Sequence, residues 1–286
     1  MNKNTLIHNC LNHKHLDHKN LKSNSIYSWN YCNTCWLIFN TIINKKHKVF
    51  KNKLKIFDKF IKSNINEEFK SIYKKIILLT NLKNKKWLDF GCGTGNELEY
   101  LKKKKINCFG FEPNKKLYQK CRKKKLMVSN NIKNLGKHFD IIFTRNTFKY
   151  VDNFPKNISI LSNLLKQKGL FVWRDKYFDF MPIHKSMNNF NESMVTSTFL
   201  RKDSIKNYLD LLNFEIILSK FYLDESFFII AKKKIKPKKK FYKNYNLNKS
   251  NLLIYKHNVL LNIISIFRLA LFNLYILSRS IKNSLF

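Results

Sequence analysis

The stretch WLDFGCGTGNELEYL, residues 87–101, joins a short apolar run to an amphipathic run through three closely spaced glycines. This order predicts a strand, a tight loop and a helix. Glycine suits such a loop because it adopts backbone angles that other residues avoid, and because it places no Cβ in the way of a ligand. The spacing Gly91-x-Gly93-x-Gly95 differs from the GxGxxG of dinucleotide sites, although the expected geometry is related.

Carboxylates lie on both sides of this loop and at the end of the next apolar run. Asp89 comes two residues before the first glycine, and Glu97 lies in the first turn of the expected helix. Acidic residues there would repel a pyrophosphate and favour a cationic ligand. The run Cys108–Glu112 ends in an acid 21 residues after Gly91, where a carboxylate can accept two hydrogen bonds from a ribose diol. Alone, the loop would equally fit an ordinary tight turn.

Short apolar runs alternate with charged stretches of helical pattern between Lys86 and about Lys233. The runs read KWLDF, NCFGFE, FDIIFT, GLFVW, FEIIL and SFFIIA. Such runs, separated by helices, are typical of a mostly parallel sheet that is covered on both faces. The sequence therefore predicts an α/β protein.

Composition divides the chain into four zones. Residues 1–40 are rich in Cys, His and Trp, whereas residues 41–84 are rich in Lys and carry apolar residues at helical spacing, from Phe57 to Ile76, which predicts a helical connector. Residues 85–234 form the α/β domain. Residues 235–286 combine a basic linker with a long apolar segment.

Four further segments continue the pattern that begins at the glycine loop. They are FDIIF (139–143), TRNTFKYVDN (144–153), LSNLLKQKGLFVWRD (161–175) and LRKDSIKNYLDLLNFEII (200–217), with Asn213 where glycine is usual. Together with LDFGCGTG and the acid that follows it, this series resembles the class I S-adenosylmethionine (SAM)-dependent methyltransferases over about residues 86–233. The resemblance implies a Rossmann-like, seven-stranded methyltransferase domain that uses SAM.

The resemblance also implies which residues bind the cofactor. Asp89 and the loop backbone would hold the methionine end, Glu112 would take the ribose hydroxyls, and Asn131 would meet the adenine. Arg145 and Asn146, at the end of the apolar run FDIIFT, would flank the emerging methyl group. The expected cofactor-binding residues are Asp89, Gly91, Cys92, Gly93, Gly95, Glu112, Asn131, Arg145 and Asn146.

Methyl transfer from a sulfonium is an in-line displacement, so most of the catalysis can come from holding the two reactants in line. A base is needed only when the acceptor must lose a proton. The candidates are His184, Asp175 and Tyr150, of which His184 is preferred because the ordinary pKa of histidine lies near the working pH. An ordinary loop histidine is the alternative interpretation of His184.

The N-terminal zone contains two pairs of candidate metal ligands. Cys10-x2-His13 and Cys32-x2-Cys35 have the spacing of a tetrahedral structural zinc site, in which His15 or His18 could replace His13. The second pair, in WNYCNTCWLIFN, resembles the N-terminal zinc module of some methyltransferases, including sugar C-methyltransferases. In the first pair, His13 stands where that module has Cys, so a degenerate module with two buried thiols is the alternative.

The net charge of +38 invites a nucleic-acid interpretation, but only six of the 56 positive residues are Arg. Nucleic-acid readers depend on Arg for bidentate contacts, so a nucleic-acid partner is not expected. Residues 232–286 contain thirteen Lys or Arg and no acid, and residues 258–278 carry a single charge, Arg268. A basic run beside an apolar or amphipathic helix favours an anionic membrane surface. Packing of that helix on the protein itself is the alternative.

The functional prediction is a SAM-dependent methyltransferase that acts on a small-molecule or glycan acceptor. The first residues, MNKNTLIHNC, lack a secretory signal, so the cytoplasm is expected, with peripheral attachment to the inner face of the membrane as a further possibility. Two alternatives stay open at this point: methylation of RNA or protein, and a non-catalytic membrane adaptor with a relic methyltransferase fold.

Overall fold

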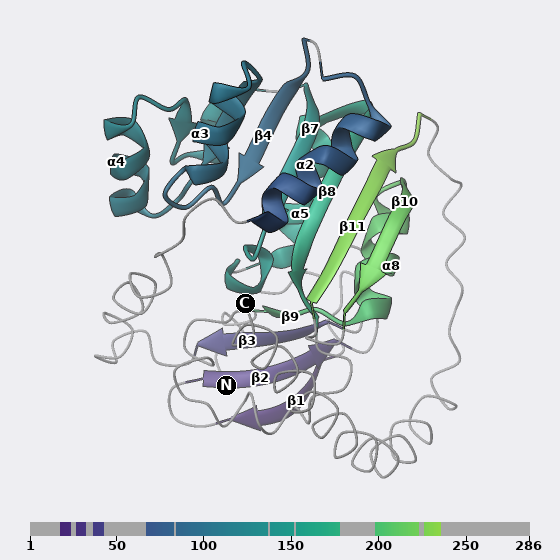
Figure 1. Cartoon of the computed structure of the whole chain (residues 1–286). Helices are drawn as coiled ribbons and strands as arrows, with labels where there is room; N and C mark the ends of the chain where they lie inside the picture. Colours follow the sequence, from purple (N-terminus) through teal and green to yellow (C-terminus); the bar gives the residue numbers. More distant parts are fainter. Residues whose placement is uncertain are drawn as a thin grey trace, which may run out of the picture.

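A computed structural model of the chain describes two β-sheets and the helices around the larger one (Figure 1). The residues that it describes are 18–23, 27–32, 37–42, 67–82, 84–136, 138–151, 153–177, 198–222 and 226–235.

The larger sheet has seven strands in the order β10-β11-β8-β7-β4-β5-β6. Their bounds are β4 Lys86–Phe90, β5 Asn107–Phe111, β6 Val128–Ser129, β7 Phe139–Arg145, β8 Leu165–Lys176, β10 Phe214–Phe221 and β11 Ser226–Lys233. All neighbours pair in parallel except β11, which is antiparallel to both β8 and β10. The predicted seven-stranded, Rossmann-like α/β class is confirmed, and each predicted apolar run forms a strand.

Helices cover both faces of this sheet, because its strands carry apolar side chains on both sides. The described helices are α2 Glu67–Leu79, α3 Asn96–Lys103, α4 Lys115–Lys123, α5 Phe154–Leu164 and α8 Lys202–Leu211, with short 3-10 turns η1 Ile132–Leu135 and η2 Phe148–Tyr150. In α2 the buried residues Phe69, Ile72, Tyr73 and Ile76 have helical spacing, as predicted for this part of the connector. The earlier part of the connector, before residue 67, lies outside the described residues.

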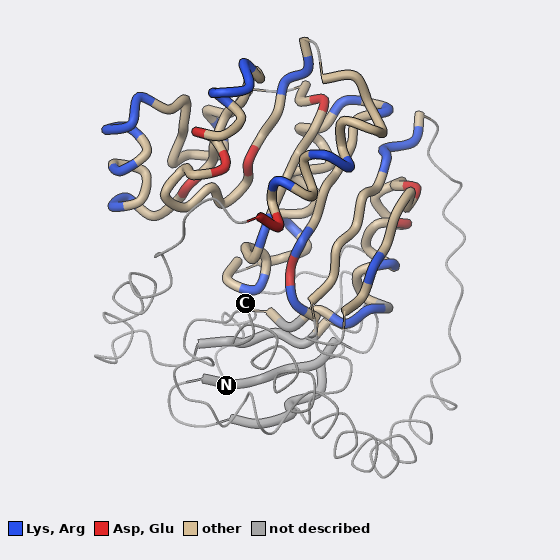
Figure 2. Tube along the Cα trace, viewed as in Figure 1, with Lys and Arg blue, Asp and Glu red and all other residues tan. Residues whose placement is uncertain are grey.

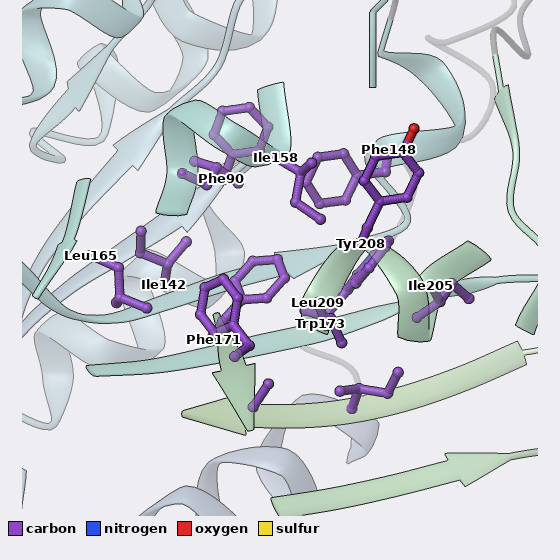
Figure 3. Close-up of a cluster of buried hydrophobic side chains, with 14 of the residues drawn as sticks. Phe90, Ile142, Phe148, Ile158, Leu165, Phe171, Trp173, Ile205, Tyr208 and Leu209 are labelled. Atoms are coloured by element: carbon purple, nitrogen blue, oxygen red, sulfur yellow. The ribbon is translucent and has the colours of Figure 1, made fainter. Parts of the chain in front are cut away.

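The two faces hold two separate hydrophobic clusters. On one face α2 packs over Trp87, Phe143 and Val172. On the other face, α5 and α8 enclose a cluster of aromatic and aliphatic side chains around Trp173 and Tyr208, which Figure 3 shows in close-up. This packing fixes the strand ends and therefore the loops that follow them.

The order of the strands determines where a ligand can bind. From β4 the chain continues outward to β5 and β6, and then returns to β7 on the other side of β4. The loops after β4 and β7 therefore diverge at the carboxyl ends of these strands, which is where open α/β sheets bind their ligands. The glycine loop follows β4 directly and lies at this switch point.

The smaller sheet joins the N-terminal zone to the rest of the protein. It consists of β1 His18–Ser23, β2 Tyr27–Cys32, β3 Ile38–Ile42 and β9 Thr198–Phe199, all antiparallel, in the order β1-β2-β3-β9. Strand β9 comes from the segment between β8 and α8 and lies against η2. The first three strands are thereby held at the end of the large sheet where β7 and β8 terminate (Figure 1).

Leu37, just before β3, is fully buried in the main cluster together with Leu200. We expect Leu37→Ala to lower the free energy of unfolding by about 2–5 kcal/mol, because it removes a buried side chain and leaves a cavity. Thermal and urea denaturation would measure the loss. Leu78→Ala, at an exposed position of α2, is the matched control and should change stability by less than about 0.5 kcal/mol. Equal stability of the two variants would contradict the docking of the N-terminal strands through Leu37.

None of the helices formed by the described residues is both long and apolar enough to cross a bilayer. The apolar segment 258–278 lies outside those residues.

Candidate functional site

The loop between β4 and α3 depends on left-handed backbone at all three of its glycines. Gly91, Gly93 and Gly95 have φ angles of 81°, 57° and 78°. Only glycine adopts this region without a steric penalty of about 1–2 kcal/mol. The loop therefore turns the chain from β4 into α3 within five residues, as predicted from the sequence.

The surroundings of these glycines differ, and the difference locates the open side of the loop. A Cβ on Gly91 would lie 2.4 Å from Thr147 Oγ1, and one on Gly95 would lie 2.4 Å from Leu126 Cδ1. A Cβ on Gly93 would have no atom of the described residues within 4 Å. Packing therefore requires glycine at positions 91 and 95. At Gly93 there is an open space, the cradle, which a side chain would fill and which a ligand can occupy.

Glu112 follows β5 directly and ties the loop to that strand. Its Oε2 accepts a hydrogen bond from the Gly93 amide at 2.9 Å, and its Oε1 accepts one from the Asn114 amide at 2.9 Å. Burial raises the pKa of Glu112 above its usual value, and the two amide donors offset only part of this rise. Each carboxylate oxygen can accept more than one hydrogen bond, so this arrangement leaves capacity for ribose hydroxyls.

Asp89 is the most unusual polar group at the site. It is buried at the carboxyl end of β4, and its Oδ2 has no hydrogen-bond partner among the described residues. Burial raises the pKa of Asp89 well above its usual value; Glu97 raises it further, whereas Arg145 lowers it. An unpartnered buried acceptor is costly unless a ligand supplies the missing donor.

An ion pair connects the two sides of the switch point beside Asp89. Arg145, at the end of β7, donates to the carboxylate of Glu97 in the first turn of α3, and both side chains are largely buried. With Asp89 the group contains two acids and one base. This excess of acid fits the ammonium and sulfonium charges of SAM, so the residues present fit the expected cofactor.

The other predicted cofactor residues lie close to the same edge but differ in what they offer. The Cys92 side chain is buried beneath the loop with Cys121, so only its backbone faces the site. Asn131 follows β6 and caps η1 by accepting from the Lys133 amide at 3.0 Å. Asn146 has a φ of 54°, and its amide donates to the Arg174 carbonyl at 2.8 Å.

Two of the three candidate bases lie at the same end of the sheet. Asp175, near the end of β8, is fully buried and accepts from the amides of Phe148 at 3.0 Å and Lys176 at 2.9 Å. Burial raises its pKa, and nearby Lys149 lowers it. Tyr150 ends η2 and is partly buried, with the Lys149 ammonium 4.8 Å from the centre of its ring. His184 lies outside the described residues.

Two residues at this site were not predicted as part of it. Thr147 closes over Gly91, and its single O–H can donate to the carbonyl of Arg145, at 3.0 Å, or of Phe90, at 3.3 Å. Glu97 was noticed only as an acid in the first helical turn. Its partner Arg145 lies 48 residues further along the chain, and no local pattern could have identified the pair.

The predicted zinc ligands remain untested by the structure. Cys10, His13 and Cys35 lie outside the described residues, and Cys32 is described only as the last residue of β2. Within the described part of the chain, no three His, Cys, Asp or Glu side chains are grouped so that they could hold a metal ion.

Comparison with known proteins gives a family match and a set of similar folds. Residues 61–219 match a family described as a methyltransferase domain. An uncharacterized protein of Haemophilus influenzae is 29% identical across 35% of this chain and 45% of its own length, so the match spans less than half of that relative.

The solved structures that are similar to this one are distant in sequence. A SAM-dependent methyltransferase from Archaeoglobus fulgidus has a TM-score of 0.50 at 17% identity and covers 63% of this chain and 99% of its own. One from Clostridium acetobutylicum has a TM-score of 0.49 at 18% identity, covering 65% and 100%. The first of these likenesses supports the fold.

Proposed function

The chain belongs to the methyltransferase-domain family, and from that premise we propose that it transfers a methyl group from SAM to a small-molecule or glycan acceptor. The observations that carry the proposal come from the described residues at the end of β4: a buried Asp89 oxygen has no hydrogen-bond partner among them, and the space in front of Gly93 is open. The Asp89 oxygen can accept a hydrogen bond from the ammonium group at the methionine end of SAM. Gly93, which has no side chain, leaves space for that end of the ligand.

Each residue of the site has a role in this proposal. Asp89, with Glu97 nearby, attracts the cationic end of the cofactor, and Glu112 accepts from the ribose while it keeps the loop in place. Asn131 lies on the adenine side. When bound, SAM supplies an electrophilic methyl group on a sulfonium. The protein contributes mainly by keeping the acceptor and the methyl carbon in line in a site that excludes water.

The acceptor side of the site faces η2 and the residues that hold it. Asp175 fixes η2 through the Phe148 amide, and β9 brings the N-terminal strands against the same turn. We propose that these segments form the wall of the acceptor site. Tyr150 and His184 are the candidates for removing a proton when the acceptor is a hydroxyl or an ammonium.

Asp175 is better suited to positioning than to proton transfer, because both of its oxygens accept from backbone amides. We expect Asp175→Ala to lower the free energy of unfolding by about 1–3 kcal/mol, because the buried Phe148 amide and the part-buried Lys176 amide lose their partner. The pH–rate profile of the remaining activity should keep its shape. If Asp175→Ala instead lost the fall in rate at low pH while its free energy of unfolding stayed unchanged, Asp175 would be the base. Tyr150→Phe, which removes only a hydroxyl, provides the comparison.

Calorimetry of the full-length protein tests cofactor binding directly. We expect SAM and S-adenosylhomocysteine to bind with micromolar affinity, and NAD, whose pyrophosphate would meet the acidic site, to give no heat. Absence of heat with SAM would refute the enzymatic proposal and favour a relic fold that serves as an adaptor. A labelled-methyl assay against extracted glycans, lipids, RNA and protein would then identify the acceptor.

Methylation of RNA or protein is the competing proposal, and the high positive charge is its only support. It predicts RNA binding that weakens steeply as salt is raised. Filter binding at increasing salt would test it, and RNA affinity that does not depend on salt would exclude it.

We further propose that Cys10, His13, Cys32 and Cys35 hold a structural zinc ion, on the basis of their spacing in the sequence. Metal analysis of the purified protein should give one zinc per chain, and the double variant Cys32→Ser/Cys35→Ser should give none. A zinc-free wild-type protein that remains folded would support the degenerate module. For localisation we propose the cytoplasm, with contact to the inner face of the membrane.

A further inference from the structure

Large apolar side chains are exposed at the edge of the sheet opposite the candidate site. Three consecutive residues at the end of α2, Ile77, Leu78 and Leu79, are 45%, 85% and 44% exposed. Helix α2 ends shortly before β4 begins, so this end lies at the amino-terminal edge of the parallel strands. Ile235, 58% exposed, follows the end of β11, which is antiparallel and therefore ends at the same edge (Figure 1).

Lysines occupy the loops that enter the strands at this edge. They include Lys85 and Lys86 before and within β4, Lys104 and Lys105 before β5, Lys124 and Lys125 before β6, Lys166 and Lys168 at the start of β8, and Lys232 and Lys234 at the end of β11. Figure 2 shows Lys and Arg positions, in blue, along the upper border of the larger sheet.

Within the part of the chain that the structure describes, acids at this edge are fewer than the lysines. Asp140 in β7 is shared by Lys85, at 3.6 Å, and Lys166, at 3.0 Å, and Glu99 in α3 pairs with Lys124 at 2.8 Å. Glu215 in β10 lies opposite Lys232 in the strand pairing. In the sequence, Ile235 is followed directly by KPKKK, residues 236–240, which lie outside the described residues.

We propose that this edge docks on an anionic lipid bilayer. We call it the basic–apolar edge, and it is formed by Ile77, Leu78, Leu79, Ile235 and the surrounding lysines. The proposal deepens the membrane contact proposed above and does not depend on methyl transfer. Stable attachment to a bilayer needs two signals, an apolar insertion and a positive surface, and both occur here. Each lysine near an anionic surface contributes about 1 kcal/mol.

A nucleic acid fits this surface less well than a bilayer does. Phosphate contacts would use the lysines, but they would leave Leu78 and its neighbours exposed to water. In a bilayer, the same side chains gain about 25 cal/mol for each Å² of apolar surface that they bury. The apolar residues therefore decide between the two partners.

Docking through this edge also sets the distance between the membrane and the candidate site. The glycine loop follows the carboxyl end of β4, five residues from its amino end, so the cofactor site would stand roughly 15 Å or more above the docked edge. An acceptor reached from this position would lie in the aqueous layer beyond the lipid headgroups, as a soluble sugar or the outer part of a long headgroup does.

Vesicle sedimentation of the full-length protein tests the proposal. We expect binding to equimolar phosphatidylglycerol–phosphatidylcholine vesicles and little binding to phosphatidylcholine alone. Leu78→Asp should lower the partition coefficient by about tenfold, because it removes the most exposed apolar side chain and adds a repelled charge. The control is Ile217→Asp, at a 42% exposed position in the middle of β10, which should change binding by less than about twofold.

Three results would overturn the proposal. The first is equal binding to neutral and anionic vesicles, and the second is identical binding by the two variants. The third is a large fall in the melting temperature of Leu78→Asp with intact vesicle binding, because it would mean that another part of the protein covers the end of α2. Sedimentation without SAM keeps these results separate from failure of the methyltransferase proposal, which calorimetry detects.

Discussion

Replacing Gly93 with alanine is expected to leave the protein folded and to weaken SAM binding by about tenfold to a hundredfold. The added Cβ meets no atom of the described residues, so the cost to stability is limited to about 1–2 kcal/mol for a left-handed non-glycine residue. The methyl group would fill the cradle that we assign to the cofactor. A tenfold loss of affinity corresponds to about 1.4 kcal/mol. Calorimetry and thermal denaturation of the same sample would measure both quantities.

Gly95→Ala is the matched control, and its effect should be the reverse. Its Cβ would lie 2.4 Å from Leu126 Cδ1 and 3.0 Å from Cys121 Sγ, in a closely packed cluster. We expect a loss of about 2–5 kcal/mol of stability from backbone strain and overpacking together. If Gly93→Ala binds SAM as the wild type does, or if both variants lose stability equally, the open side of the loop has been misassigned.

Asp89→Asn is expected to make the cofactor-free protein more stable and its SAM binding weaker. The substitution keeps the shape of the side chain but removes a buried charge whose Oδ2 has no hydrogen-bond partner among the residues that the structure describes. The gain in stability should appear at neutral pH, where the unfolded chain carries a charged Asp89 and burial in the folded protein disfavours that charge. The loss of affinity should be about tenfold or more, because the cationic end of the ligand loses its counter-charge.

The pH dependence of the two proteins gives a second test of Asp89. The pKa of Asp89 is raised in the folded state, so above the ordinary pKa of about 4 the folded protein holds a proton that the unfolded chain has released. The wild type therefore loses stability relative to Asp89→Asn as pH rises from about 4 through the raised pKa, and the difference is constant above it. SAM affinity of the wild type should increase over the same interval, whereas that of Asp89→Asn should not.

Denaturation and calorimetry at a series of pH values would measure these trends. Glu112→Gln is the control, because Glu112 is also buried but has two amide partners, and its removal should destabilise the protein. If the wild type instead gained stability relative to Asp89→Asn as pH rises, the assignment of Asp89 as an uncompensated charge would be wrong.

Sequence reasoning was most successful where the signal is local. Each apolar run forms a strand, and the three loop glycines have the predicted left-handed backbone. Asn213, noted because glycine is usual there, has a φ of 64°, which asparagine tolerates better than most residues. Such features depend on neighbours along the chain, so a single sequence is enough to find them.

Reasoning from the sequence was less successful where function depends on residues that are far apart. Asp175 was a candidate base because of its position after a strand. Its burial and its bond to the Phe148 amide, 27 residues away, now favour a positioning role. The N-terminal zone was treated as a module of its own, and nothing in its composition indicated that β3 pairs with β9.

The sequence by itself determined the strands, the glycine loop and the acid after β5, because the periodicity of apolar side chains and the freedom of glycine act over a few residues. Only the tertiary structure decided that Arg145 pairs with Glu97, that Thr147 closes over Gly91, and that one oxygen of Asp89 has no hydrogen-bond partner within the described residues. These contacts arise because the sheet places β7 beside β4, although more than 50 residues separate Trp87 in β4 from Ile141 opposite it in β7. These contacts also distinguish the glycine loop, as a candidate cofactor site, from an ordinary tight turn.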